Sequence, residues 1–404
     1  MASTNGITVR SATTADRPAI VQLVETCFGM RYDKDELEHQ PGIFPVERAL
    51  VAMDGDRIVG HTVDRTMIVT VPGERTVEAC GVSAVVVAPT HRRRGILREL
   101  YTRQHERTEA DGLPLTIFTA SEGTIYGRFG YAPSIESSTF EIHDPRRAEF
   151  RPGTPDPGGV ELAEPAEAEA EAHLREVYDR WRRLVPGAQE RPPAKWSLLM
   201  ADPERNRDGA SSLFALTHPD GYVLYRRRWS ESGNTAFVVE FRAVTTEAHI
   251  ALWRMLLSLD LVHRIEGSIS DDDALPYLLT DPRLVRITRR HDELWTRIMD
   301  VPAALSARTY RHDLDVTLAV ADSFRNKGGT FALRVRDGIA ECEPTDRAPD
   351  LELGIDVLGG LYFGAHRARA FAAANRIQVK DAAALRAFDD ALTTDRTAEL
   401  GWFF

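Results

Sequence analysis

Hydrophobic and polar residues in the first 150 positions switch between strand-like and helix-like periods. Three largely apolar runs of strand length indicate consecutive strands. They cover residues 49–53, 58–71 and 77–88, and the turn signals Asp54-Gly55 and Pro72-Gly73 separate them. Short turns of this kind join neighbouring antiparallel strands, so the pattern predicts an antiparallel meander.

Helical spacing is found on both sides of this meander. A helix is expected over residues 15–28, and a second, amphipathic helix begins at Ile96 and ends at Gly112. After it come a strand at residues 115–118, a short helix around Ile125-Tyr126 and a closing strand from about Ser138. The first 150 residues therefore form one mixed unit in which a strand leads through a loop into a helix.

The same order of elements recurs after a linker rich in Pro and Gly at residues 152–159. We interpret the Glu- and Ala-rich run 161–176 as the solvated face of a helix. Strands are expected at 213–216, 222–228 and 236–244, with a hairpin turn at Asp220-Gly221 and a helix containing Ile250 to Leu257. This order matches that of the first unit, so we interpret the segment as a second copy of the same fold.

From about Val301 the pattern changes once more. Strands at 315–321, 330–335 and 339–344, followed by helices at 354–361 and 382–392, predict a third domain of the α+β class. The chain of 404 residues is too long for one compact core. We therefore divide this mixed α/β chain into domains at residues 1–150, 151–298 and 299–404.

Composition and charge narrow the class of protein. Hydrophobic residues make up 43% and charged residues 27% of the chain, as in ordinary soluble globular proteins. The net charge of −11 argues against nucleic acid as the main partner and is compatible with a cationic substrate. No apolar run approaches the roughly 20 residues that a membrane-spanning helix needs, and the N-terminus lacks the pattern of a secretory signal.

Cysteine and histidine usage points to an intracellular protein without a structural metal. Cys27, Cys80 and Cys342 are far apart in the sequence and show no C-x-x-C spacing, which argues against a disulfide framework or a zinc site. The twelve histidines include no pair with metal-ligand spacing on a clear helix. We therefore expect a cytoplasmic location and no metal.

The strongest chemical signal is the segment VVVAPTHRRRGIL, residues 85–97. Here a strand leads through a loop into a helix start, where unpaired backbone amides and the helix dipole favour an anion. Gly95 allows close backbone approach, and the three arginines supply donors suited to phosphate oxygens. Three positive charges at a helix start destabilise it unless an anion neutralises them. We interpret the segment as a phosphate-binding loop, which His91 caps without taking part in chemistry.

A second motif, ASEGTIYGRFGY, covers residues 120–131. Together the two motifs resemble the signatures of the GNAT superfamily of acetyltransferases. In the acyl-CoA signature R/Q-x-x-G-x-G/A, Arg92 and Gly95 match, and Leu97 replaces the final small residue. The resemblance implies that acetyl-CoA is the co-substrate and that Tyr126 is the general acid that protonates the leaving thiolate.

The GNAT resemblance also implies which residues contact CoA. The strand edge formed by Val85, Val86 and Val87 would pair with the pantetheine arm, and Ser121 and Glu122 would line the thioester side. The pyrophosphate would be held by a set of residues at the helix start, namely Arg93, Arg94, Gly95, Ile96, Leu97 and Arg98.

The order of the domains is similar to that of the Eis (enhanced intracellular survival) family. Two GNAT-like units precede a domain that resembles sterol carrier proteins. In the second unit, residues 245–249 read TTEAH where the first unit has its Arg-rich loop, so this copy has lost the anion site. The resemblance covers essentially the whole chain. It implies acetylation of primary amines, notably on aminoglycosides, and assembly as a hexamer.

The chain closes on the aromatic run Trp402-Phe403-Phe404. Chain ends are usually frayed, but each aromatic side chain buries about 150–250 Å² when packed, so this tail is expected to dock. The Eis resemblance implies that the terminal carboxylate of Phe404 is the general base. An α-carboxylate ordinarily has a pKa of about 3.3–3.7, and burial against Trp402 and Phe403 is expected to raise that pKa.

Other functions stay open at this stage. The third domain could make the chain a lipid-binding or carrier protein, although an intact phosphate-binding loop argues against this. The enzyme could also transfer long acyl chains, a preference that depends on cavity size. The amine acceptor is open among aminoglycosides, polyamines and lysine side chains. Four acidic residues could line an entrance for such cations or form a solvated helix face, namely Asp33, Asp35, Glu36 and Glu38.

Overall fold

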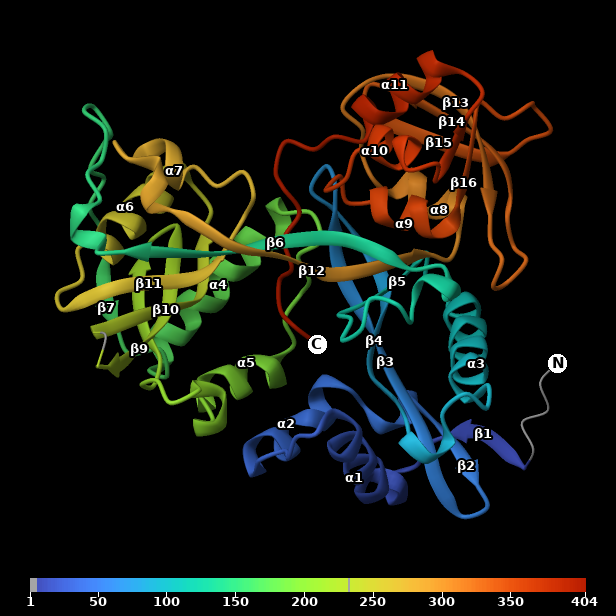
Figure 1. The fold of residues 1–404 in the computed structure, drawn as a ribbon, viewed down its shortest axis with the longest axis horizontal. Helices are drawn as coiled ribbons and strands as arrows, with labels where there is room; N and C mark the ends of the chain where they lie inside the picture. The colour runs from blue at the N-terminus through green and yellow to red at the C-terminus, as the bar shows by residue number, and fades with distance from the viewer. Residues whose placement is uncertain (1–5, 232) are drawn as a thin grey trace. The chain divides into compact units, whose positions relative to one another are not determined.

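The computed structural model describes residues 6–231 and 233–404. The chain divides into two compact units, each built from segments that are distant in the sequence (Figure 1). Unit 1 comprises Met1–Ile135, Pro186–Ala194 and Asp292–Phe404, and unit 2 comprises Glu136–Val185 and Lys195–His291.

The predicted meander forms the centre of the sheet of unit 1. Its strands are β2 (Ala49–Asp54), β3 (Arg57–Val71) and β4 (Arg75–Val87), which pair antiparallel. The predicted strand β5 (Leu115–Phe118) runs parallel to β4. Strand β1 (Ile7–Ser11), which the pattern did not indicate, adds to β2 at the edge. The sequence order of the meander is thus also its spatial order.

Three helices accompany this sheet: α1 (Arg17–Phe28), α2 (Lys34–Ile43) and α3 (Ile96–Ala110). The first and third agree with the predicted helices. Ile96 and Leu100 of α3 pack with Ala52 and Val59 in a buried hydrophobic cluster, so the sheet fixes the start of α3. At α2 the Glu36 amide donates to the Asp33 carboxylate at 2.8 Å, which gives two of the four acidic residues a helix-capping role.

Two long strands, β6 (Ala132–His143) and β12 (Arg286–Ile298), run through both units. In unit 1, β12 pairs with β5, with Trp295 opposite Phe118. In unit 2, β6 pairs with β11 (Val262–Ile269). The closing strand was predicted from about Ser138, whereas β6 begins at Ala132. Its start was missed because it contains Pro133, and proline is uncommon within strands. The neighbouring Ser134 hydroxyl is hydrogen-bonded to the Thr296 hydroxyl of β12 at 2.7 Å.

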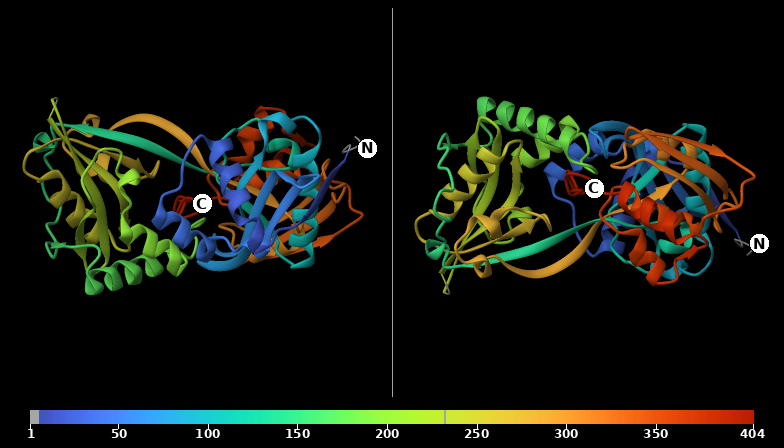
Figure 2. Two further views of the ribbon diagram at one scale, coloured as in Figure 1. Left: turned by 90° about the horizontal axis from the view of Figure 1, so that it is seen from below. Right: turned by 90° about the horizontal axis from the view of Figure 1, so that it is seen from above.

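Unit 2 contains a sheet in the order β6-β11-β10-β9-β8-β7. Its other strands are β7 (Glu161–Ala163), β8 (Phe214–His218), β9 (Gly221–Ser230) and β10 (Gly233–Ala243). The helices are α4 (Ala168–Leu184), α5 (Pro193–Ala201), α6 (Thr246–Leu257) and α7 (Leu275–Leu278). Figure 2 shows α4 running along this sheet, which it contacts at β9 and β10.

The acidic run 161–176 differs from its prediction as one solvated helix. Residues 161–163 form the edge strand β7, and α4 begins only at Ala168. The helix continues to Leu184 and buries Leu174, Val177, Tyr178 and Trp181. The Glu-rich composition correctly indicated the exposed face of α4. Most of the apolar residues that α4 buries lie after the predicted segment.

The start of α6 in unit 2 is capped from within the chain. The Thr245 hydroxyl accepts from the Ala248 amide at 3.2 Å, and Glu247 lies in the first turn. This cap satisfies an amide and offsets the helix dipole. The start of α6 corresponds to the helix start that is the predicted anion site in the first copy, and here Glu247 already supplies a negative charge.

The remaining part of unit 1 is a five-stranded sheet in the order β15-β14-β13-β16-β17. Its strands are β13 (Leu314–Ala321), β14 (Gly329–Arg336), β15 (Ile339–Pro344), β16 (Leu351–Gly354) and β17 (Ile377–Val379). Its helices are α8 (Val301–Ala307), α9 (Ile355–Leu361), α10 (Ala368–Ala373) and α11 (Ala382–Ala391). The three longer strands and helices α9 and α11 agree with the prediction, whereas β16 and β17 were too short to be recognised.

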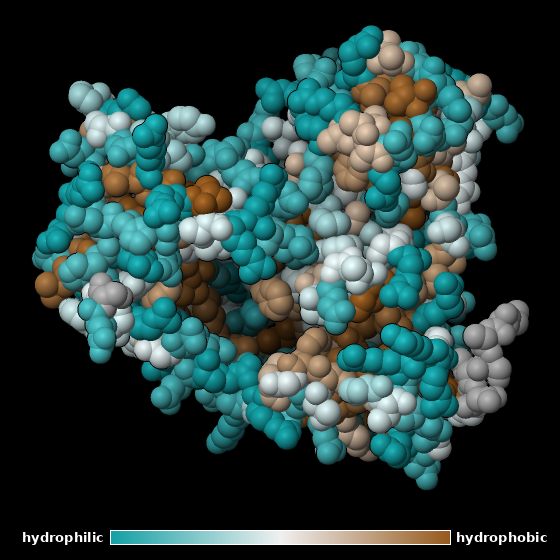
Figure 3. Space-filling view, viewed as in Figure 1, coloured by the Kyte–Doolittle hydropathy of each residue, from teal (hydrophilic) through white to brown (hydrophobic). Residues whose placement is uncertain are grey.

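Hydrophilic residues cover most of the face shown in Figure 3. Among the described residues, no helix combines the length and the apolar character that crossing a membrane would require.

Candidate active site

Strands β4 and β5 separate along the sheet of unit 1. They pair from Ala79 opposite Leu115 to Gly81 opposite Ile117, whereas β3 stays paired with β4 as far as Val87. The segment Val82–Val87 of β4 thus continues past the ladder with β5. It contains Val85, Val86 and Val87, which the sequence predicted to pair with the pantetheine arm.

An irregularity in β4 accompanies this separation. Ala84 has a φ of 49°, and the pairing between β3 and β4 shifts register between His61 and Val63. The buried His61 ring places Nδ1 2.8 Å from the Ala84 carbonyl oxygen, so Nδ1–H donates to that oxygen. Burial lowers the pKa of His61 to about 4, which keeps its ring neutral at physiological pH. His61 was missed because no sequence motif marks it.

The predicted phosphate-binding loop connects β4 to α3. A one-turn 3-10 helix at Pro89–His91 is followed by positive φ values of 61° at Arg93 and 80° at Gly95, and α3 begins at Ile96. Among the residues that the structure describes, no side chain caps this helix start. The amides of its first turn therefore lack a side-chain acceptor, which is compatible with the predicted anion site.

Asp54 anchors this loop to the turn between β2 and β3. His91 Nε2 lies 3.0 Å from the Asp54 carboxylate, and Arg94 reaches the same carboxylate at 3.5 Å. The hydrogen bond from His91 and the charge of Arg94 lower the pKa of Asp54 below its usual value. His91 is thus held in a loop-fixing contact, in line with its predicted capping role.

Tyr126 lies in an aromatic environment at the end of β5. Its ring centroid is 4.4 Å from that of Phe118 and 6.2 Å from those of Tyr101 and Trp295. Burial raises the pKa of Tyr126, the Glu122 charge raises it further, and a hydrogen bond to Ser121 opposes the shift. The hydroxyl therefore stays protonated, as an acid requires. The predicted short helix is a single 3-10 turn, Gly127–Phe129, directly after Tyr126.

The C-terminal tail is docked against residues 186–191 of the same unit. The Trp402 indole donates to the Glu190 carbonyl at 3.0 Å, and the Gly401 amide donates to the Gln189 side chain at 3.0 Å. Arg191 donates to the Gly401 carbonyl at 3.2 Å. Trp402 is only 5% exposed, so docking of this tail, which its composition had suggested, is found in the structure.

The last residue lies beside the end of β5. The Thr119 hydroxyl donates to the backbone oxygen of Phe404, and the Phe404 ring lies 5.3 Å from Trp402 and 6.4 Å from Phe44 between centroids. Phe403, expected to help bury the carboxylate, is 70% exposed, whereas Trp402 and Phe404 on either side of it are buried. Trp402 and Phe44 form the apolar contacts instead.

The predicted acid and the last residue of the chain thus both contact the C-terminal end of β5, through two consecutive residues. Phe118 packs on Tyr126, and the next residue, Thr119, holds Phe404. The loop at Arg93–Ile96 follows β4, the strand that separates from β5. Among the predicted CoA contacts, the Arg98 guanidinium lies 5.2 Å from the centroid of the Phe324 ring. Ser121 and Glu122 are exposed next to Tyr126.

Comparisons with known proteins agree with this arrangement. Profiles described as acetyltransferase (GNAT) domains match residues 8–134 and 187–311, and a sterol carrier protein domain profile matches residues 301–400. The N-acetyltransferase Eis of Mycobacterium tuberculosis is 42% identical over 409 aligned residues, which cover 98% of this chain and all of that protein. The chain belongs to the Eis family of N-acetyltransferases.

Solved structures share the fold. Eis1 from Mycobacterium abscessus superposes with a TM-score of 0.87 at 32% identity, covering 98% of this chain and all of that one. A GCN5-related N-acetyltransferase from Anabaena variabilis has a TM-score of 0.85 at 20% identity over 98% of this chain and all of its own, which shows the fold alone. The protein is an Eis-type acetyltransferase with two GNAT domains and a sterol-carrier-like domain, and GNAT acetyltransferases use acetyl-CoA.

Proposed function

We propose that this Eis-family enzyme transfers the acetyl group of acetyl-CoA to a primary amine, with the Phe404 carboxylate as general base and Tyr126 as general acid. The observation that carries the proposal is the docked tail, which brings the chain end to Thr119 beside the Phe118–Tyr126 contact. Separate groups for accepting and donating a proton are what an acyl transfer to an amine needs.

The proposed reaction has one bond-forming and one bond-breaking event. The Phe404 carboxylate accepts a proton from the incoming ammonium, and the free amine attacks the thioester carbonyl. The carbon–sulfur bond then breaks, and Tyr126 gives its proton to the departing thiolate. The acylated nitrogen still carries one proton more than an amide has, and this proton returns to the Tyr126 oxygen, which restores the acid. The products are an N-acetyl amine and CoA. A tyrosine with a raised pKa stays protonated until that step, which supports its role as the acid.

For the acetyl donor we propose the site predicted from the sequence. The β4 edge at Val85–Val87 would pair with the pantetheine arm, and the loop and helix start at Arg93–Arg98 would hold the pyrophosphate, mainly through backbone amides. Ser121 and Glu122 would lie on the thioester side. The separation of β4 from β5 and the uncapped start of α3 support this placement.

We propose aminoglycosides or similar polycationic amines as acceptors. The net charge of −11 supports a cationic substrate, since it raises the local concentration of cations. A panel of aminoglycosides, polyamines and lysine peptides with acetyl-CoA, followed by thiol release, would rank these classes. Replacing acetyl-CoA with longer acyl-CoA donors in the same assay tests acyl-chain preference.

The remaining proposals concern organisation. We propose three domains at residues 1–150, 151–298 and 299–404, a cytoplasmic location and a homo-hexamer with closed symmetry. Light scattering at several protein concentrations tests the assembly, because a chain of 45.1 kDa that stays monomeric would contradict it.

The sharpest test of the function alters the chain end alone. A C-terminal hexahistidine extension, amidation, or deletion of Phe404 should abolish turnover and leave acetyl-CoA binding by calorimetry unchanged. The matched control is the same tag at the N-terminus, which should change neither. Acetylation at the native rate by the C-terminally extended protein would exclude the carboxylate as the base.

A further inference from the structure

Arg297 lies in the interior of unit 1 beside the turn that follows Tyr126. Its side chain is 1% exposed, among the most buried of the large side chains in the described residues. Trp295 and Arg297 are two positions apart on β12 and so lie on the same face of the strand. Trp295 packs against the Tyr126 ring, and Arg297 Nη1 donates to the Phe129 carbonyl at 2.7 Å.

The turn that Arg297 contacts is also hydrogen-bonded to the backbone of Tyr126. The amides of Phe129 and Tyr131 donate to the Tyr126 carbonyl at 2.9 and 3.4 Å. Gly130 adopts a φ of 84°, and a Cβ there would lie 1.9 Å from Arg297 Nη1. Glycine is therefore required both by the turn and by the arginine. The Phe129 ring stacks on Tyr101 at 4.8 Å, which fixes the other side of the turn.

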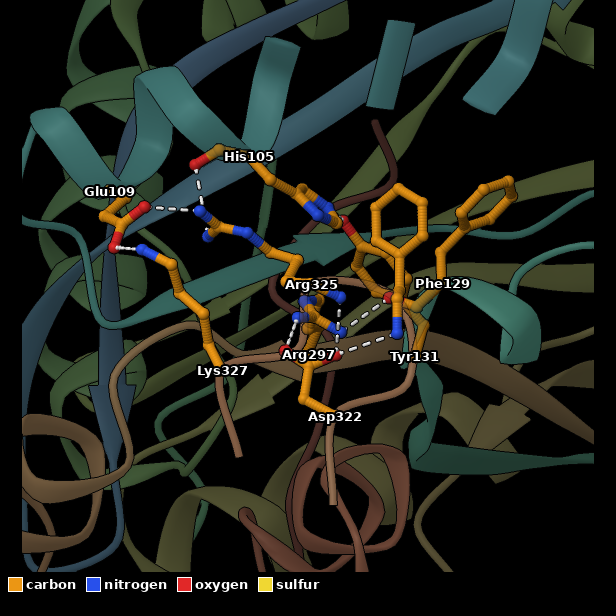
Figure 4. Close-up of polar contacts among 9 residues, drawn as sticks. His105, Glu109, Phe129, Tyr131, Arg297, Asp322, Arg325 and Lys327 are labelled. Atoms are coloured by element: carbon orange, nitrogen blue, oxygen red, sulfur yellow. Dashed lines mark hydrogen bonds and ion pairs between the residues drawn. The ribbon is translucent and has the colours of Figure 1, made fainter. Parts of the chain in front are cut away.

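Arg297 is itself held by the loop between β13 and β14. Its Nη2 donates to the Asp322 carboxylate at 2.5 Å, and this carboxylate is also buried (Figure 4). The other oxygen of Asp322 accepts from the amides of Phe324 and Arg325 at 3.2 Å. The same loop contacts α3, since both Arg325 and Lys327 pair with Glu109. The sterol-carrier-like domain is thereby connected to the turn after Tyr126.

A buried ion pair at this place calls for an explanation other than stability. Removing two charges from water carries a large desolvation cost, and apolar pairs often replace buried ion pairs without loss of stability. An arginine, however, can donate to a carbonyl and a carboxylate at once with a fixed geometry. Such a group suits the positioning of a backbone turn.

We propose that Arg297, oriented by Asp322, is a positioning residue that fixes the Tyr126–Gly130 turn and hence the direction of the Tyr126 hydroxyl. This inference rests on the proposed role of Tyr126 as the general acid. Arg297 acts through the turn and touches no reacting atom. The third domain thus contributes to the acid step through Asp322, in addition to the tail that it carries.

The test is the double substitution Arg297→Met with Asp322→Asn, which removes both charges and keeps an oxygen for the Phe324 and Arg325 amides. We expect kcat to fall about 10- to 100-fold, as misplacement of a catalytic group does, with the Kd for acetyl-CoA within twofold. Adding Tyr126→Phe should lower kcat no further than Tyr126→Phe alone, because both changes disable the same acid. A purely structural pair would give independent, multiplicative losses.

Two controls keep the result interpretable. Arg308→Met removes another fully buried arginine, which donates to the Tyr362 and Leu392 carbonyls away from Tyr126. It should lower the Tm and leave kcat unchanged. Arg297→Lys keeps the buried charge but replaces the two nitrogens that hold the Phe129 carbonyl and the Asp322 carboxylate with one, which loses the fixed geometry of the guanidinium. It supplies the same kinetic test if the double variant does not fold.

The outcomes separate this inference from the proposed function. Native kcat in the Arg297→Met/Asp322→Asn protein, or losses that multiply with Tyr126→Phe, would overturn the positioning role while leaving Tyr126 as the acid. Native kcat in Tyr126→Phe alone would remove the acid assignment and the positioning role with it.

Discussion

Docking of the C-terminal tail can be weakened without changing its terminal charge, by the substitution Trp402→Ala. The Trp402 ring is 5% exposed and packs against Phe404, and its indole donates to the Glu190 carbonyl. Truncating a buried aromatic residue to alanine costs about 3–5 kcal/mol. Loss of the hydrogen bond adds about 1 kcal/mol. The docked state of the tail should therefore lose about 4–6 kcal/mol.

This loss corresponds to a change of about a thousandfold or more in the ratio of docked to detached tail, since about 1.4 kcal/mol is a factor of ten. We expect kcat to fall at least about a hundredfold in steady-state assays of thiol release, while acetyl-CoA binding by calorimetry is retained. Trp402→Phe keeps an aromatic ring and loses only the donor, so its decrease in kcat should be several-fold.

The matched control is Phe403→Ala at the neighbouring position. Phe403 is 70% exposed, so truncating it should change stability by no more than about 0.5 kcal/mol and leave kcat unchanged. A Trp402→Ala protein with native kcat, or equal losses in Trp402→Ala and Phe403→Ala, would refute the link between tail docking and turnover.

Three other perturbations test separate parts of the site. Gly95→Asp places a side chain at a residue with a φ of 80° and brings a negative charge to the helix start, and Arg93→Glu reverses a charge there. Both variants should lose CoA binding in calorimetry and keep the fold by circular dichroism. Tyr126→Phe should lower kcat by about 10²-fold or more with little change in KM, as for a lost general acid, and a normal kcat would make Tyr126 a packing residue. The pKa of His61 is about 4 in the folded protein and near 6.5 in the unfolded chain, so the unfolded chain binds the proton more readily. The folded state therefore loses about 3 kcal/mol of stability as the pH falls from 6.5 to 4. His61→Asn keeps a donor for the Ala84 carbonyl and cannot titrate, so chemical denaturation at several pH values should show a weaker acid dependence in this variant.

Features that depend on local sequence were predicted well. The period of the apolar residues located β2 to β5, α1 and α3, and the loop that contains Gly95 was placed correctly between β4 and α3. The meander at residues 315–344 indicated a third domain of the α+β class, and its likeness to sterol carrier proteins came from the resemblance of the whole chain to the Eis family. These signals are local because each reflects the conformational preference or the chemistry of a few consecutive residues.

Features that depend on distant pairing were not predicted. Trp295 and Arg297 lie on a strand whose first half is strongly polar, and nothing near them indicates that β5 is their partner. Thr119 and Phe44 are ordinary residues until Phe404 docks beside them. The Ser134 hydroxyl at the start of β6 finds its partner in Thr296 of β12, 162 residues later in the chain. In each case the partner lies far away in the sequence, where no periodicity can reveal it.

The pairing of β12 with β5 has a consequence for biosynthesis. Domains generally fold as units while the chain leaves the ribosome, the N-terminal part first. Residues 115–118 must wait for residues 295–298 before their second edge is covered, and strands exposed in this way are prone to pair with other chains. A nascent or truncated chain that ends before β12 would present an open sheet edge and lack Trp295 beside Tyr126. Fragments made by premature termination should therefore be inactive and bound for aggregation or chaperone capture.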